Sequence, residues 1–367
     1  MRLYFLIKNL SSSVGGAERV LTQVASSLAE RRYEVIVVTF DPIGSSSFYP
    51  LSPKVKFINL PSVNNIQQVN IFSLVRRVFL IRSSITACNP DIVIGFMHSS
   101  FVLAALACAF RRIPIIGSEH IVMNHYYTRP LQFCLYLISS FFVDRYTFIS
   151  QSVASNFPYL IRRKMSVIPN PVLVRSSNQP LSTAHKIILN VGRLEQQKDQ
   201  ATLIKAFHKV LKVHPEWFLP IVGSGSLASS LNDLVCSLRI QDNVIFRGNV
   251  KDIASEYSKA SLFVNSALYE SFGLVTAEAM SFSLPCIGFA DCPGTNELIK
   301  HLYSGYLVNP QKDRVNALSD ALIDAINNPD DFTMMGRNAR DFISSKFSLT
   351  EVVNKWEDLI LSFPTRS

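Results

Sequence analysis

The sequence predicts an α/β protein made of two Rossmann-like, doubly wound domains, and three observations lead to this prediction. The chain has 367 residues, which suits two domains of about 150–200 residues better than one core. Short β-branched apolar runs alternate with helical patterns from end to end, as expected when parallel strands are connected by helices. A polar, turn-rich stretch at 172–186 interrupts this alternation once.

The apolar runs are continuous rather than alternating, which is typical of strands buried on both faces of a parallel sheet. The strands predicted before the break are Leu3–Ile7, Glu34–Phe40, Val55–Leu60, Asp91–Met97, Ile113–Glu119, Tyr146–Ser150 and Ser166–Pro169. Those predicted after it are Lys186–Val191, Trp217–Val222, Asn243–Arg247, Leu262–Val264, Leu284–Phe289 and Gly305–Val308.

Helical patterns occupy the gaps, and the segment Ala17–Arg31 places its aliphatic side chains on one side of a helix. We therefore expect one domain over residues 1–175 and a second over 182–349. A last helix within 350–367 is expected to pack back on the first domain. Ligands of open parallel sheets bind beyond the carboxyl ends of the strands, so the informative residues should directly follow strands.

Composition excludes several classes of protein. With 48% apolar and 17% charged residues the chain is not disordered. Its longest apolar stretch, 131–143, is shorter than the roughly 20 residues that span a bilayer, and the N-terminus offers no signal-peptide core, which predicts a cytoplasmic protein. The cysteines are expected to be buried free thiols, because none forms a Cys-x-x-Cys pair.

Charge is unevenly distributed between the two halves. Residues 1–175 carry a net charge of +11 and residues 176–367 a net charge of −2. This asymmetry predicts an anionic partner for the first half. No nucleic-acid-binding motif is present, so an anionic membrane surface is the favoured partner and nucleic acid is not expected.

Two glycine motifs follow predicted strands. "GGAER", residues 15–19, stands at the head of the first helix, where Gly16 would let the backbone approach an anion. "GSGS", with Gly223 and Gly225, precedes a later helix and could support a base or a phosphate. Ordinary tight turns explain either motif equally well when it is taken alone.

A cationic loop follows the first strand of the second half, in "NVGRLEQQKD". Gly192 ends the strand, and Arg193 and Lys198 lie within one loop after it. Two cations in such a loop can hold a diphosphate through charge-assisted hydrogen bonds. A solvated loop is the alternative, because Lys and Arg are usually exposed.

An acidic segment, "YESFGLVTAEAM", occupies residues 269–280. Glu270 lies in a loop, free to accept hydrogen bonds from sugar hydroxyls, and the helix expected to start at Gly273 would direct its first amides at an anion. Glu278 lies within an otherwise apolar helix and needs a polar partner. In the first half, "GSEH" places Glu119 and His120 at the end of a strand, where His120 is either a site residue or a structural one.

Taken in this order over the whole chain, "GGAER", "SEH", "NVGRLEQQKD", "GSGS" and "ESFGLVTAEAM" resemble the retaining family-four glycosyltransferases of bacterial lipid-linked oligosaccharide and surface polysaccharide pathways. The resemblance implies the GT-B fold, in which two Rossmann-like domains face a central cleft. It implies that the first domain faces the acceptor and the membrane and that the second binds a nucleotide-sugar donor. The donor carrier expected from the resemblance is uridine diphosphate.

The resemblance also assigns roles to residues. Arg193 and Lys198 would hold the donor diphosphate, Glu270 would contact hydroxyls of the donor sugar, and His120 would lie beside that sugar. Glu278 would bind the ribose. The remaining donor contacts would come from backbone at Gly16, Gly192, Gly223, Gly225, Phe272, Gly273, Leu274 and Val275.

The implied reaction transfers a hexose or N-acetylhexosamine with retention of configuration, without metal or other cofactor. The acceptor would be a polyprenyl-diphosphate-linked glycan, and the enzyme would be peripheral on the inner face of the cell membrane. Segment 73–85 mixes Arg76, Arg77 and Arg82 with large apolar side chains, as interfacial helices do, although a buried helix with snorkelling ends fits nearly as well.

Two other functions fit the same features. A sugar-nucleotide epimerase of this fold would bind the same donor and need no acceptor. A non-catalytic nucleotide-sugar sensor could dispense with Glu270 or Lys198, yet both are present. A dinucleotide oxidoreductase is disfavoured, because the first loop lacks Gly-x-Gly-x-x-Gly.

Overall fold

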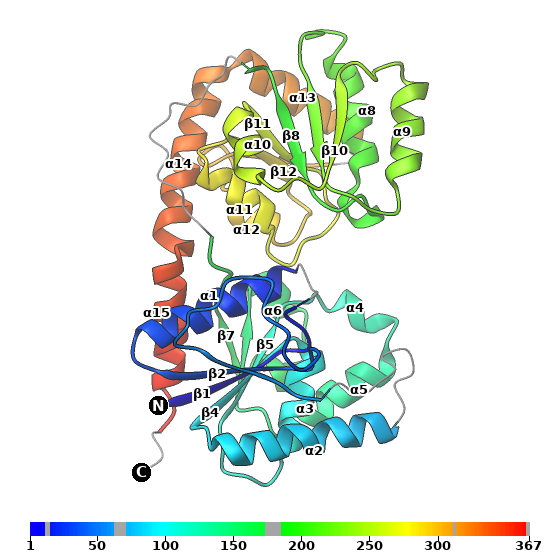
Figure 1. Ribbon diagram of the computed structural model, residues 1–367. Helices are drawn as coiled ribbons and strands as arrows, with labels where there is room; N and C mark the ends of the chain where they lie inside the picture. The colour runs from blue at the N-terminus through cyan, green and yellow to red at the C-terminus, as the bar shows by residue number, and fades with distance from the viewer. Residues whose placement is uncertain (12–14, 62–70, 173–184, 311–312, 365–367) are drawn as a thin grey trace. The chain divides into compact units, whose positions relative to one another are not determined.

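The structure of the chain is a computed structural model that describes residues 1–11, 15–61, 71–172, 185–310 and 313–364 (Figure 1). It divides into two compact units. Unit 1 comprises Met1–Pro171 together with Leu349–Ser367, and unit 2 comprises Val172–Ser348. The C-terminal segment therefore groups with the N-terminal half of the chain.

Unit 1 contains a parallel sheet with the strand order β3-β2-β1-β4-β5-β6-β7. Its strands are β1 Arg2–Leu6, β2 Glu34–Thr39, β3 Lys56–Asn59, β4 Ile92–Phe96, β5 Ile115–Glu119, β6 Arg145–Phe148 and β7 Met165–Val167. Pairing is in register along β1, where Leu3 is opposite Val35 on one side and Ile92 on the other. The order reverses between β1 and β4, which makes the carboxyl ends of these two strands the topological switch point.

Helices cover both faces of this sheet because successive strand residues point to opposite sides. In β1, Tyr4 and Leu6 join one apolar core, which α2 and α3 cover, and Leu3 and Phe5 join the other, which α1 and α15 cover. The helices of unit 1 are α1 Gly16–Glu30, α2 Ile71–Cys88, α3 His98–Cys108, α4 Asn124–Tyr127, α5 Pro130–Ser139, α6 Gln151–Ser155, α7 Tyr159–Arg162 and α15 Leu349–Leu361.

The last helix, α15, packs against α1 and the sheet of unit 1. Its Trp356 is buried and stacks on Phe96, with ring centroids 5.7 Å apart. Its Glu357 accepts hydrogen bonds from Arg31 at 2.7 Å and from the Tyr33 hydroxyl at 2.9 Å. The end of the chain is thus held on unit 1 by the buried apolar face of α15 and by the Arg31–Glu357 ion pair.

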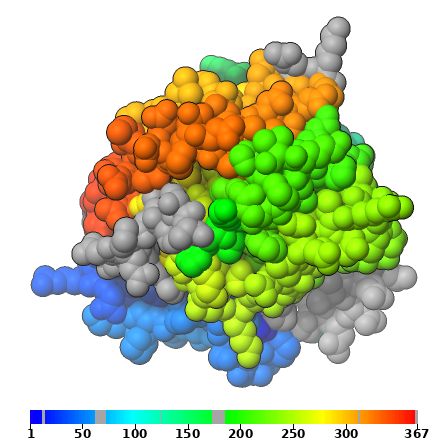
Figure 2. All heavy atoms as spheres, turned by 90° about the horizontal axis from the view of Figure 1, so that it is seen from above, coloured from blue at the N-terminus to red at the C-terminus, as the bar shows by residue number. Residues whose placement is uncertain are grey.

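Unit 2 repeats the architecture with a parallel sheet of order β10-β9-β8-β11-β12-β13. Its strands are β8 Ile188–Val191, β9 Leu219–Val222, β10 Val244–Gly248, β11 Leu262–Asn265, β12 Cys286–Phe289 and β13 Tyr306–Val308. Its helices are α8 Gln200–Val210, α9 Ala228–Ser237, α10 Ile253–Lys259, α11 Leu274–Ser281, α12 Thr295–Leu298, α13 Arg314–Asn327 and α14 Pro329–Phe347. Figure 2 shows α8 in green beside the orange helices of this unit on one face.

The two-domain α/β prediction is confirmed, and each predicted strand has a counterpart whose ends lie within two residues of those predicted. The prediction of buried thiols is correct for Cys88, Cys108, Cys286 and Cys292, which are free and buried. It is wrong for Cys134 and Cys236, which are exposed because their helix positions face away from the sheet. Among the described residues, no helix is both long and apolar enough to span a bilayer.

Candidate active site

The polar motifs of unit 2 gather at the carboxyl edge of its sheet. The strand order reverses between β8 and β11, and this edge is where open parallel sheets bind their ligands. The loop with Arg193 and Lys198 directly follows β8, and the loop with Glu270 follows β11. The topology therefore joins two motifs that are more than seventy residues apart in sequence.

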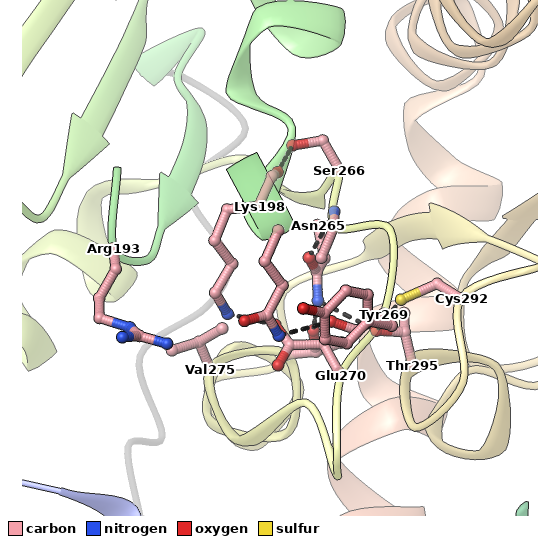
Figure 3. Close-up of polar contacts among 12 residues, drawn as sticks. Arg193, Lys198, Asn265, Ser266, Tyr269, Glu270, Val275, Cys292 and Thr295 are labelled. Carbon is pink, nitrogen blue, oxygen red and sulfur yellow. Dashed lines mark hydrogen bonds and ion pairs between the residues drawn. The ribbon is translucent and has the colours of Figure 1, made fainter. Parts of the chain in front are cut away.

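An ion pair joins these two loops. The Lys198 ammonium donates to Oε1 of Glu270, and their side chains are only 13% and 11% exposed (Figure 3). The sequence predicted that Glu270 is free to bind sugar hydroxyls, whereas in the structure one of its oxygens already accepts from Lys198. A charged pair this deeply buried is costly unless both partners are present.

Further hydrogen bonds between the same loops fix the position of the pair. The Gln197 side-chain amide donates to the Tyr269 carbonyl at 2.8 Å, and the Leu268 amide donates to the Gln197 carbonyl at 2.9 Å. The Ser266 hydroxyl donates to the Lys198 carbonyl at 2.8 Å. The pair is therefore held from both sides by backbone as well as side chains, as preorganised sites are.

Arg193 presents an exposed cation next to this pair (Figure 3). In the part of the chain that the structure describes, no carboxylate forms an ion pair with its guanidinium. Its carbonyl, by contrast, accepts from the Gln200 side chain at 3.0 Å, which fixes the backbone from which the side chain extends. The guanidinium is thus available for an anionic ligand.

The glycines of the neighbouring loops are required by close packing. Gly223 has φ +138°, and a Cβ there would lie 2.0 Å from the Gly192 carbonyl oxygen. A Cβ at Gly225 would lie 2.4 Å from the Leu194 carbonyl oxygen. Only glycine lets the loop after β9 lie this close to the loop after β8.

Helix α11 begins at this edge and directs its N-terminus there. Gly273 precedes it with φ +80°, a left-handed conformation that favours glycine. The amides of Leu274 and Val275 are the first of the helix and have no acceptor within it. Phe272 is buried against Phe347, with ring centroids 5.5 Å apart, so its side chain serves packing and only its backbone remains for a ligand.

Glu278 has the polar partner that its apolar surroundings require. The Tyr257 hydroxyl lies 3.2 Å from Oε2 of Glu278, and the glutamate is half-buried. Tyr257 comes from α10, which precedes the acidic segment and is separated from it by β11.

Sequence reasoning missed a buried network that supports the Glu270 loop. The side-chain amide of Asn265 donates to the hydroxyls of Thr276 at 2.9 Å and Thr295 at 3.0 Å. The Glu270 amide donates to the Pro293 carbonyl at 3.1 Å, and a Cβ at Gly294 would lie 2.7 Å from the Glu270 carbonyl oxygen. The sequence signal that could have indicated this contact is the dipeptide Pro293-Gly294, which marks a turn after the predicted strand Leu284–Phe289.

The remaining predicted residues belong to unit 1. Gly16 is the first residue of α1 and is exposed, and His120 directly follows β5. The Nε2 atom of His120 lies 3.0 Å from the Ser118 hydroxyl, and its ring stacks on Phe96 at 5.2 Å. Burial lowers the pKa of His120 to about 4, so its imidazole is neutral at physiological pH.

Glu119 holds the loop that carries His120. It is fully buried, and its Oε1 accepts from the amides of His120 and Ile121, both at 3.0 Å. Its Oε2 accepts from the Tyr126 hydroxyl at 2.7 Å. Burial raises the pKa of Glu119 to about 7, although these three donors stabilise its charged form.

Comparisons with known proteins agree with this organisation. Residues 14–174 match the family described as Glycosyltransferase Family 4, and residues 175–342 match the family described as Glycosyl transferases group 1. The two matches follow one another along the chain, one for each sheet.

Full-length relatives extend the agreement. An uncharacterized glycosyltransferase of Haemophilus influenzae is 25% identical over 98% of this chain and 99% of its own length. The N-acetyl-alpha-D-glucosaminyl L-malate synthase of Bacillus anthracis is 22% identical over 95% of this chain and 94% of its own. The crystal structure of Anabaena HepE in complex with UDP superposes with a TM-score of 0.80, at 19% identity, over 99% of this chain and 100% of that one.

The structural neighbour supports the GT-B fold, and the two family matches with the relatives support the activity. The chain belongs to the glycosyltransferases, with a Family 4 domain followed by a group 1 domain.

Proposed function

We propose that this glycosyltransferase moves a hexose or N-acetylhexosamine from a UDP-sugar to a polyprenyl-diphosphate-linked glycan, with retention of configuration and without a metal ion. The observation that carries the proposal is the buried Lys198–Glu270 pair beside the exposed Arg193, at the carboxyl edge of unit 2. The Anabaena protein of the same fold was solved with UDP, which supports UDP as the carrier.

Each part of this edge suits one part of the donor. The cations of Arg193 and Lys198 and the N-terminus of α11 suit the diphosphate. The second oxygen of Glu270 suits a sugar hydroxyl, since only Oε1 accepts from Lys198. Glu278 suits the ribose, because it lies one helical turn beyond the N-terminus of α11.

These groups favour departure of the nucleoside diphosphate. As the bond between the anomeric carbon and the diphosphate oxygen breaks, negative charge develops on the leaving group, and the fixed cations stabilise it electrostatically. The sugar becomes oxocarbenium-like, as in glycoside chemistry. The acceptor hydroxyl attacks from the face that the diphosphate leaves, and its proton passes to the departing diphosphate, so configuration is retained.

The test is a thermal-shift screen with UDP, UDP-glucose and UDP-N-acetylglucosamine, followed by a transfer assay in excess chelator. A ligand that binds only the folded state stabilises it and so raises Tm. At a ligand concentration of one hundred times Kd, the free energy of unfolding increases by about 2.7 kcal/mol. We expect a Tm increase with at least one UDP-sugar and full turnover in chelator, because protein cations neutralise the diphosphate. Turnover that needs added magnesium contradicts the metal-free reaction, and a donor isomer formed without acceptor favours an epimerase.

Attachment to an anionic membrane is the second part of the proposal, and α2 supports it. Its Phe72 and Phe79 side chains are 80% and 67% exposed, and Val75 and Arg76 are exposed at the helical spacing between them. This combination of aromatic, aliphatic and basic side chains on one face is typical of helices that lie in a membrane interface.

The three arginines predicted for this contact are not equivalent. Arg76 is exposed. The Arg77 guanidinium lies 5.8 Å from the Phe40 ring centroid, and Arg82 donates to the Ala107 carbonyl at 3.1 Å. Only Arg76 can therefore be changed as a membrane contact without disturbing contacts inside unit 1.

We predict that the protein sediments with anionic phosphatidylglycerol vesicles and that salt releases it. Each basic residue near an anionic surface contributes about 1 kcal/mol to the binding free energy. Salt screens this electrostatic attraction and therefore weakens binding. The variant Phe72→Ser, Arg76→Glu, Phe79→Ser should lose most of this binding and retain its Tm. Met334→Ser, an exposed apolar change in unit 2, should bind as the native chain does. Equal binding to neutral and anionic vesicles contradicts the prediction.

A further inference from the structure

A basic cluster occupies the carboxyl edge of unit 1 and has no role in the proposed donor chemistry. It consists of His98, His125 and Arg129. His98 is the first residue of α3 and follows β4 at the switch point of the sheet, His125 lies in α4, and Arg129 directly precedes α5. The position is one where open parallel sheets bind ligands.

The three side chains form a chain of contacts. The rings of His98 and His125 have centroids 5.3 Å apart, and the ring of Tyr126 lies 5.3 Å from each of them. Nη1 of Arg129 lies 3.4 Å from Nδ1 of His125 and donates to the His125 carbonyl at 3.0 Å. Nη1 also donates to the Thr128 hydroxyl at 3.3 Å, and among the described residues Nη2 and Nε have no acceptor, which leaves them as donors for a ligand.

The positive charge of the Arg129 guanidinium is not balanced within this cluster. Across the described ranges, no carboxylate forms an ion pair with any of the three side chains. Glu119 contacts Tyr126, whose ring packs against both imidazoles, but its oxygens are occupied by the Tyr126 hydroxyl and two backbone amides. Gln132 forms hydrogen bonds with both imidazoles and carries no charge.

Neighbouring positive charge lowers the pKa values of both histidines. Burial, then repulsion by His125 and Arg129, lowers the pKa of His98 to about 4. Burial and repulsion by Arg129 also lower the pKa of His125. An anion bound among the three groups would reverse the repulsive contribution, because it favours the protonated imidazoles.

We propose that His98, His125 and Arg129 form a phosphate-binding site for the acceptor. The inference rests on the proposed function, in which the acceptor carries a diphosphate and unit 2 binds that of the donor. Arginine favours phosphate because its planar donors match two of the oxygens at once. Tyr127 and Leu131 flank Arg129 and are 72% and 78% exposed, which suits an apolar chain attached to the phosphate.

The first test measures the imidazole pKa values by NMR of histidine-labelled protein, titrated with inorganic pyrophosphate. Saturating UDP is present throughout, so that the donor site of unit 2 is already filled. Pyrophosphate should raise the pKa of His125 and of His98 in the native chain. In Arg129→Gln the pyrophosphate Kd should rise at least tenfold. Arg145→Gln should bind as the native chain does, because Arg145 is exposed and its guanidinium donates to the Asp144 carbonyl at 3.2 Å, away from the cluster in sequence. Unchanged histidines, or equal binding by the two variants, overturn the proposal.

The second test separates the source of the phosphate. Two acceptors are compared, a glycan on a short prenyl diphosphate and the same glycan as a neutral glycoside. The kcat/KM for the diphosphate acceptor divided by that for the neutral acceptor should fall at least tenfold in Arg129→Gln and should not change in Arg145→Gln. Phosphatidylglycerol vesicles without acceptor should not displace pyrophosphate. Displacement would assign the site to membrane headgroups and overturn the acceptor assignment. If neither glycan accepts sugar while pyrophosphate still raises the histidine pKa values, the proposed function fails and the anion site stands.

Discussion

Lys198→Ala is expected to lower the rate of sugar transfer by about 10²–10³-fold, the usual cost of removing one preorganised electrostatic contact. The ammonium of Lys198 lies at the carboxyl edge of unit 2 and pairs with Glu270. Its loss removes positive charge from the place where the departing diphosphate develops negative charge. The measurement is kcat with a saturating UDP-sugar.

Glu270→Ala is expected to be equally damaging, since it removes a sugar contact and leaves Lys198 unpaired. Breaking a buried pair from one side typically destabilises a protein by about 3–5 kcal/mol, so each variant needs a Tm measurement beside its kcat. Glu270→Gln is the conservative variant, because the amide can still accept a hydrogen bond from Lys198.

The matched control for this pair is Lys186→Ala. Lys186 also belongs to unit 2 and pairs with Glu216 at 3.3 Å, but both side chains are largely exposed. Such surface pairs contribute about 0–1 kcal/mol, so this variant should retain both Tm and turnover. Near-native kcat in folded Lys198→Ala or Glu270→Ala would remove that residue from the mechanism.

Gly223→Ala is expected to abolish most UDP binding, with at least a tenfold increase in Kd. The new Cβ would lie 2.0 Å from the Gly192 carbonyl oxygen, so the loop that carries Arg193 and Lys198 must move. In a preorganised site, a displacement of about 1 Å is enough to cost roughly 10²-fold in rate. The measurement is the UDP-induced increase in Tm, which should be small or absent.

Gly248→Ala is the control for backbone strain alone. Gly248 has φ +62°, so alanine is strained there too, but no heavy atom lies within 4 Å of the added Cβ. It should lose about 1 kcal/mol of stability and bind UDP normally. If Gly223→Ala binds UDP as tightly as Gly248→Ala does, the close approach of the two loops is not needed for the donor.

Much of the fold could be predicted from the sequence because its signals are local. Continuous apolar runs indicate strands buried on both faces, and a helical period indicates the amphipathic segments that cover them. Thus α1 begins within a residue of the helix expected over 17–31, and α15 begins within a residue of the segment 350–367 in which the last helix is expected. The motifs could likewise be placed at strand ends, since a glycine or a charge after an apolar run marks where a strand stops.

The candidate site could be predicted only as a set of separate motifs. Which side chains meet depends on strand order, and strand order leaves no periodic mark in the sequence. The reversal between β8 and β11 joins Lys198 to Glu270, and Tyr257 reaches Glu278 from another helix. Neither partner could be identified from its own segment.

The sequence by itself determined the two α/β domains, the strands and the loops in which the site residues lie. Only the tertiary structure decided which charges are neutralised and which are not. It pairs Glu270 with Lys198, engages Arg82 inside unit 1, and leaves His125 and Arg129 without a carboxylate partner in the described residues. The physical reason is that the energy and ionisation of a charged group depend on its burial and on neighbours within a few ångströms. Folding brings these neighbours together from segments that are far apart in the sequence.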